Sequence, residues 1–150
     1  MRGVVQRVSS ASVVVRTTDG PSTEVGRIGP GLCVLVGVTH TDDDAAATKL
    51  AAKVWNLRIF ADENGAMNRS AAESGLEVLI VSQFTLYGDT RKGRRPSFVD
   101  AARPDDAERL IEVVVDELRR LGATVATGRF RTDMAVSLVN DGPVTVLIET

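Results

Sequence analysis

Apolar and polar residues alternate through the first quarter of the chain, a pattern typical of β-strands with one buried face. Two short runs lie on either side of residues 9–11, with apolar positions at Val4, Val8, Val13 and Val15. Residues 22–38 (STEVGRIGPGLCVLVGV) predict two further strands that meet at a Gly-Pro-Gly turn. The first quarter is therefore expected to be β-structure.

The apolar spacing changes to a helical period after residue 41. The repeating positions are Ala46, Leu50, Val54 and Leu57. Three consecutive aspartates at 42–44 suit the positive end of a helix dipole. We therefore predict an amphipathic helix over residues 42–60.

A second helix is predicted near residue 104. Pro104 is acceptable at a helix start, and Asp105 with Glu108 resembles a capping box. One apolar face then continues until Gly122, a residue that commonly ends helices. Its members are Leu110, Val113, Val114, Leu118 and Leu121.

The remaining apolar runs predict strands. Residues 76–86 (LEVLIVSQFTL) read as one buried strand, and a polar loop follows from 88 to about 103. Residues 123–149 read as three strands, and Asp141-Gly142 is a strong hairpin signal between the last two. Pro143 is unexpected there, because proline gives no N–H to a strand ladder. The element order predicts an α+β fold with two main helices and a mainly antiparallel sheet.

Composition is that of an ordinary globular protein. The chain has 150 residues, of which 43% are hydrophobic and 25% charged, so we expect one domain over residues 1–150. No basic segment followed by a long apolar stretch begins the sequence, and no apolar window could span a bilayer. These features predict a cytoplasmic protein without a membrane partner. Cys33 lies in an apolar run and is expected to be buried and inert.

Several kinds of chemistry lack their sequence signatures. The chain has one histidine, His40, and no P-loop, dinucleotide fingerprint, G-x-S-x-G elbow or clustered Cys and His ligands. We therefore expect neither a metal nor a cofactor. The formal net charge of −2 argues against a global attraction to nucleic acid, so any RNA contact must be local.

Three local features are candidates for a site, each with a structural alternative. Ser82, Gln83 and Thr85 interrupt an apolar strand, although the pattern alone favours satisfied polar groups at a strand end. The run TRKGRRP at 90–96 could bind phosphates or be solvated. Gly142-Pro143 opens an apolar run, where it could be a plain hairpin turn or a cis bond that redirects carbonyls.

Two motifs together resemble a known family. SQFTL at 82–86 and NDGPVT at 140–145 resemble the signature motifs of the bacterial and eukaryotic D-aminoacyl-tRNA deacylases. Further similar segments are QRV at 6–8, LRIFADENGAMN at 57–68, RPSF at 95–98 and TGRFRTDM at 127–134. The resemblance covers nearly the whole chain in order. A polar insert, TTDGPST at 17–23, is longer than the usual hairpin of the family at that point.

The resemblance implies a fold and an activity. It implies a compact β-barrel-like fold and a homodimer that hydrolyses the ester bond at the 3′ end of D-aminoacyl-tRNA, without a cofactor and without DNA. Free D-amino acid and tRNA are the products, and mischarged glycyl-tRNA is left open as a further substrate. L-amino acids are rejected when their Cβ meets the pocket wall.

The resemblance also assigns roles to residues. Catalysis falls to Ser82, Gln83, Phe84 and Thr85, with backbone N–H groups near Phe84 and Thr85 facing the oxyanion and the tRNA 2′-hydroxyl assisting. A cis Gly142-Pro143 bond presents carbonyls to the partner subunit's pocket. The substrate-binding group comprises Gly142, Pro143, Asn140, Val144, Thr145 and Arg7, and the tRNA-binding group comprises Arg91, Lys92, Arg94 and Arg95.

Two other functions remain compatible with the sequence. One is a dimeric RNA-binding module that uses the basic loop at 91–95 and does not hydrolyse its ligand. The other is a general esterase in which Thr85 or Ser82 is the nucleophile, with a trappable acyl-enzyme.

Overall fold

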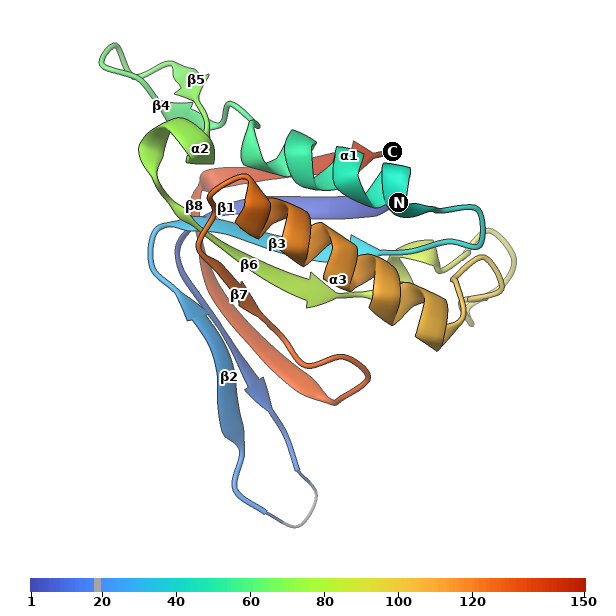
Figure 1. Ribbon diagram of the computed structural model, residues 1–150. Helices are drawn as coiled ribbons and strands as arrows, with labels where there is room; N and C mark the ends of the chain where they lie inside the picture. Colours follow the sequence, from blue (N-terminus) through green and yellow to red (C-terminus); the bar gives the residue numbers. More distant parts are fainter. Residues whose placement is uncertain (18–19) are drawn as a thin grey trace.

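The computed structural model describes residues 1–17 and 20–150, in which a mixed β-sheet curls on itself and two long helices cover one outer face (Figure 1). The main sheet contains β1 (Arg2–Val15), β2 (Thr23–Ile28), β3 (Gly31–Gly37), β6 (Glu77–Ser82), β7 (Val125–Thr127) and β8 (Met134–Glu149). The strand order is β2-β1-β3-β6-β7, and β8 pairs with β1. A small hairpin is formed by β4 (Phe60–Ala61) and β5 (Met67–Arg69).

The helices are α1 (Asp44–Trp55), α2 (Ala71–Ser74) and α3 (Pro104–Arg120), and η1 (Phe84–Tyr87) is a 3₁₀-helix. The long helices α1 and α3 lie side by side over the sheet in Figure 1. This architecture confirms the predicted α+β class with two main helices. The sheet is nearly closed into a barrel, and the β3–β6 and β6–β7 pairings are parallel among otherwise antiparallel ones.

Strand β1 is one continuous strand, so the prediction of two short runs was wrong. It pairs with β8 along its length, with β3 through its first half and with β2 through its second half. The register against β8 shifts between Val8 and Ser10, beside the polar residues that suggested a break. Such irregularities bend a strand without ending it, which lets β1 pass from one neighbour to the other.

The sheet separates two apolar clusters. On β6, Val78 and Ile80 face the helices, whereas Leu79 and Val81 face the barrel interior, because successive strand side chains point to opposite faces. Cys33 of β3 belongs to the interior cluster, and burial raises the pKa of its thiol to about 11. The expectation that this cysteine is buried is confirmed.

The barrel narrows where β2 approaches β7. A Cβ added to Gly26 would lie 2.5 Å from the carbonyl oxygen of Thr127, so only glycine permits this distance between the strands. Strands β2 and β7 contact each other, but they are not paired by ladder hydrogen bonds in the described part of the sheet. At this place the two strands approach each other by packing rather than by ladder hydrogen bonds.

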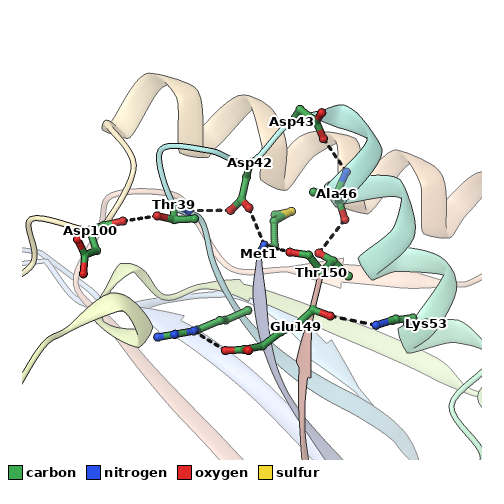
Figure 2. A network of polar contacts seen from close by, with 10 residues as sticks. Met1, Thr39, Asp42, Asp43, Ala46, Lys53, Asp100, Glu149 and Thr150 are labelled. Carbon is green, nitrogen blue, oxygen red and sulfur yellow. Dashed lines mark hydrogen bonds and ion pairs between the residues drawn. The ribbon is translucent and has the colours of Figure 1, made fainter.

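Polar contacts join the first and last residues to the loop before α1 (Figure 2). The α-ammonium group of Met1 donates to Asp42 Oδ1 at 2.6 Å and to the carbonyl oxygen of Thr150 at 2.7 Å. The other oxygen of Asp42 accepts from the Thr39 N–H at 2.7 Å. The side chains of Met1 and Asp42 are 0% and 5% exposed, so this is a buried ion pair. It holds the edge pair β1–β8 against α1.

Several predicted boundaries differ from the structure. Helix α1 ends at Trp55, because the Asn56 side chain donates to the carbonyl oxygen of Ala52 and caps the helix. The residue before α3 is Arg103, which gives no side-chain cap, so the proposed Asp105 capping box was wrong. A capping box does exist at Ser70 and Glu73, where it begins α2.

The last part of the chain also differs from the prediction. Residues 123–149 form two strands rather than three, because β8 continues through the NDGPVT motif. The expected hairpin at Asp141-Gly142 was therefore wrong. Within the polar insert at 17–23, Thr18 and Asp19 lie outside the described residues. In the described part of the chain, no helix has the length and apolar character needed to cross a membrane.

Candidate active site

A pocket of about 570 Å³ opens where β6 ends. The strand stops at Ser82, and the chain turns into η1, so the prediction that residues 76–86 form one strand was wrong. Ser82, Gln83 and Phe84 line the pocket, together with residues from the start of α3 and from the segment that leads to β8. Three residues of the predicted SQFTL motif thus line a cavity, whereas Thr85 is not among its lining residues.

Aromatic rings give this pocket an apolar lining. Phe84 is 56% exposed, and its ring meets the ring of Phe98 edge-on at 5.0 Å between centroids. Phe130 also lines the pocket. Large exposed aromatic side chains beside a cavity are suited to stacking against a planar ligand.

Thr85 lies on η1 with an exposed side chain, and its hydroxyl has a partner. The Gln83 side-chain amide donates to Thr85 Oγ1. His40 is engaged elsewhere, with its Nε2 2.7 Å from the carbonyl oxygen of Val99. A threonine hydroxyl needs a base to become a nucleophile, and an amide donor cannot act as one. This arrangement argues against the general-esterase alternative.

The backbone of η1 offers hydrogen-bond donors. Phe84 and Thr85 are its first residues, and the first N–H groups of a helix have no preceding helical carbonyl to bind. Gln83 N–H is used, because it donates to the carbonyl oxygen of Val36 at 2.8 Å. The donors at the start of η1 can therefore face a negatively charged oxygen.

The NDGPVT motif forms a large bulge in β8. Gln6 of β1 pairs with Thr145 and Val8 pairs with Asn140, so residues 141–144 all lie opposite Arg7. Gly142 has a φ of +125°, and the Gly142-Pro143 peptide bond is cis, as the resemblance implies. A bulge of this kind removes residues from the ladder and redirects their carbonyls.

Two side chains hold the bulge. The Arg7 guanidinium donates from Nε to the carbonyl oxygen of Asp141 at 3.1 Å and from Nη1 to that of Ile59 at 2.5 Å. Asn140 Nδ2 donates to the carbonyl oxygens of Arg7 at 3.0 Å and of Val144 at 2.9 Å. No side chain in residues 1–17 and 20–150 donates to the carbonyl oxygen of Gly142 or Pro143. These two carbonyls remain available to a ligand.

The predicted catalytic and substrate-binding residues form two separate groups in the chain. Ser82, Gln83 and Phe84 line the pocket, whereas none of the described residues 140–145 does so. Gly142 and Pro143 are exposed, and β8 lies at an edge, with β1 as its one hydrogen-bonded neighbour among the described strands. Thr145 lies beyond the bulge, where its hydroxyl accepts a hydrogen bond from Gln6.

The basic loop is exposed along residues 91–95. Arg91 is paired with Asp89 by two side-chain contacts of 2.9 and 2.8 Å, and this pairing lowers the pKa of Asp89 to about 2. Lys92, Arg94 and Arg95 belong to the same exposed loop. Arg91 is already neutralised by a carboxylate, so the other three cations are the better candidates for phosphate contact.

The structure adds residues that the sequence interpretation missed. Phe98, Phe130, Arg131 and Met134 line the pocket. They belong to RPSF and TGRFRTDM, which resembled the family as whole segments but offered no separate chemical pattern. Among the described residues, no three His, Cys, Asp or Glu side chains are grouped as metal ligands would be.

Comparisons with known proteins agree on one family. The family model for D-Tyr-tRNA(Tyr) deacylase matches residues 4–149. The D-aminoacyl-tRNA deacylase of Heliobacterium modesticaldum is 57% identical over 99% of this chain and 96% of its own length. That of Symbiobacterium thermophilum is 59% identical over 100% of this chain and 96% of its own length.

Solved structures have the same fold. The structure titled c-Myc DNA Unwinding Element Binding Protein has a TM-score of 0.91 at 37% identity and covers 100% of this chain and 99% of its own. A probable eukaryotic D-amino acid tRNA deacylase has a TM-score of 0.82 at 19% identity, with 99% of this chain and 98% of its own covered, and shows the shared fold.

Proposed function

Because this chain belongs to the D-Tyr-tRNA deacylase family, whose members are hydrolases, we propose that it releases D-amino acids from tRNA in a pocket completed by a second subunit. Ser82 to Thr85 of one subunit provide the hydrolytic wall. The bulge of the partner provides the carbonyls that select the D-isomer. The working enzyme is then a homodimer with two such pockets.

One observation supports this proposal most directly. The pocket beside Phe84 lacks the Gly142-Pro143 carbonyls of its own chain, and those carbonyls are exposed on an edge strand with no side-chain donor among the described residues. An exposed strand edge is open to a second chain. A twofold arrangement brings each bulge to the other subunit's pocket, so that each subunit completes the other.

Backbone carbonyls can read chirality without reading the side chain. Every aminoacyl ester has an α-ammonium group, which donates hydrogen bonds to rigid carbonyl oxygens. An L-amino acid held by the same ammonium would direct its Cβ into the wall. Glycine has no Cβ, so exclusion at that atom cannot reject it, and glycyl-tRNA is expected to be a substrate as well.

Hydrolysis then depends on positioning. The N–H groups of Phe84 and Thr85 stabilise the oxyanion of the tetrahedral intermediate, and the tRNA 2′-hydroxyl helps to activate water. The ester is already reactive, so no side-chain nucleophile is required. The Gln83 amide holds the Thr85 hydroxyl and thereby fixes the turn that presents the N–H groups.

The rest of the substrate fits the surroundings. The terminal adenine can stack among the rings of Phe84, Phe98 and Phe130, because bases bind well to aromatic side chains. The exposed cations at 92–95 lie on a loop of the same region and can contact phosphates near the 3′ end. This local charge compensates for the slightly negative net charge of the chain.

Mixed dimers test the shared pocket. Gly142→Ala damages the bulge, and Phe84→Pro removes one N–H donor at a position where a helix start accepts proline. Each variant alone is expected to be nearly inactive on D-aminoacyl-tRNA. After unfolding and joint refolding in equal amounts, heterodimers contain one fully intact pocket, which restores about a quarter of the wild-type sites. An inactive mixture would contradict a pocket built from two subunits.

A further inference from the structure

We infer that Asn140 is a positioning residue whose side-chain amide fixes the shape of the bulge and so directs the free carbonyls of Gly142 and Pro143. This inference rests on the proposed function, because the direction of those carbonyls matters only if they bind a substrate. It gives the N–H donors of Asn140 an internal role, so the substrate contact expected of this residue would have to use its Oδ1.

The hydrogen bonds of Asn140 are internal. Its Nδ2 lies 3.0 Å from the carbonyl oxygen of Arg7 on β1 and 2.9 Å from that of Val144, four residues further along β8. A side-chain amide has two N–H donors, and these two contacts use both. No donor remains for a ligand, whereas the two ends of the bulge are tied to one group.

The bulge creates the need for this bond. Where residues 141–144 leave the ladder, the carbonyl of Arg7 loses the N–H that a regular strand would offer it. Both Asn140 contacts are partly buried, and carbonyls in such positions need a donor. The Asn140 amide substitutes for the missing ladder contacts without allowing the strand to straighten.

Asn140 and Arg7 bind the two ends of the same short segment. The Arg7 guanidinium binds the carbonyl oxygen of Asp141, and Asn140 binds that of Val144. The carbonyls immediately before and after Gly142 and Pro143 are therefore both fixed. The two between them are the ones left free, and their direction follows from these anchors.

The test uses an isosteric change. Asn140→Asp keeps the size of the side chain, but its carboxylate has no N–H and faces two carbonyl oxygens. Asn140→Ala removes the side chain altogether. The matched control is Asn56→Asp, because Asn56 also donates from Nδ2 to a carbonyl oxygen, that of Ala52 at 2.9 Å, at the end of α1.

The readouts are the KM and kcat for D-aminoacyl-tRNA and the ratio of D- to L-hydrolysis by one preparation. A merely structural role would lower the active fraction for both substrates equally and leave the ratio and the KM unchanged. Each Asn140 variant loses both hydrogen bonds. We therefore expect the ratio to fall by about tenfold or more and the KM to rise. Asn56→Asp should change neither.

The outcomes separate this inference from the proposed function. A selective wild-type enzyme whose folded Asn140→Asp and Asn140→Ala variants keep the same ratio would overturn the inference alone. A wild-type protein that does not prefer D-substrates would overturn the proposed function and this inference with it. If Asn140→Asp fails to fold, Asn140→Ala decides the result, since it introduces no buried charge.

Discussion

Replacing Gly142 with alanine should destabilise the bulge by more than a glycine-to-alanine change costs at a position with free space. The Cβ of alanine would lie 2.7 Å from Arg7 Nη2 and 2.8 Å from Val144 Cγ2, well inside van der Waals contact. Gly142 also has a φ of +125°, which side-chain-bearing residues rarely adopt. Both effects act at the segment that presents the free carbonyls.

The magnitude follows from these two effects. A disfavoured backbone conformation costs about 1–3 kcal/mol, and forcing an extra methyl group into a packed site costs about 1–3 kcal/mol more. The Arg7 guanidinium could move aside, but it would then release the carbonyl oxygens of Asp141 and Ile59. Selectivity for D-substrates should therefore fall together with stability.

Gly65 provides the matched control. It has a φ of +78°, but an added Cβ would meet nothing within 4 Å. Gly65→Ala should cost only the backbone term, about 1–2 kcal/mol, and should leave selectivity unchanged. Urea unfolding and D- and L-aminoacyl-tRNA hydrolysis measure the two properties. Equal losses of stability in the two variants, with wild-type selectivity in Gly142→Ala, would refute the reasoning.

Three further predictions concern other parts of the molecule. Asp42→Asn, which removes a buried ion pair, should lower the free energy of unfolding by about 3–5 kcal/mol in urea titrations. Asp44→Asn, at an exposed pair, should lower it by less than about 1 kcal/mol, and equal losses would contradict the assignment of burial. Replacing Arg94 and Arg95 with alanine should raise the KM. It should also reduce the slope of log KM against the logarithm of the salt concentration by about 0.7 for each phosphate that the loop no longer binds. An unchanged slope would mean that the loop is only solvated. Thr85→Ala should lower kcat by about tenfold. The wild-type enzyme should hydrolyse a substrate ending in 2′-deoxyadenosine more slowly than this variant hydrolyses the normal substrate. An inactive Thr85→Ala variant, together with normal turnover of the deoxy substrate by the wild type, would indicate a threonine nucleophile.

Periodicity predicted the helices and the central strands because burial dominates there. The apolar face of α3 meets one of the two apolar clusters and the apolar run of β6 is buried between both, so their patterns report the packing directly. The fold class followed from the order of these elements. The end of β6 was not predicted, because the apolar letters of FTL continue into η1, where Phe84 is exposed rather than buried.

Local turn chemistry led to the wrong prediction at the NDGPVT motif. An Asp-Gly pair usually forms a hairpin, but β8 continues because β1 pairs with it on both sides of the bulge. The sequence contains no signal for a bulge held by Arg7, which lies 134 residues away from Asp141 in the chain. Resemblance to a family identified the motif and its cis bond, whereas only the structure showed that Arg7 and Asn140 hold the neighbouring carbonyls.

The central claim is that this protein releases D-amino acids from tRNA and spares the L-isomers. The direct measurement is deacylation of matched D- and L-aminoacyl-tRNA, with the same tRNA and the same amino acid, by one preparation of enzyme. We predict rapid release of the D-amino acid and a rate for the L-substrate close to that of spontaneous hydrolysis. Equal rates for the two substrates, or binding of D-aminoacyl-tRNA without release of amino acid, would contradict the claim.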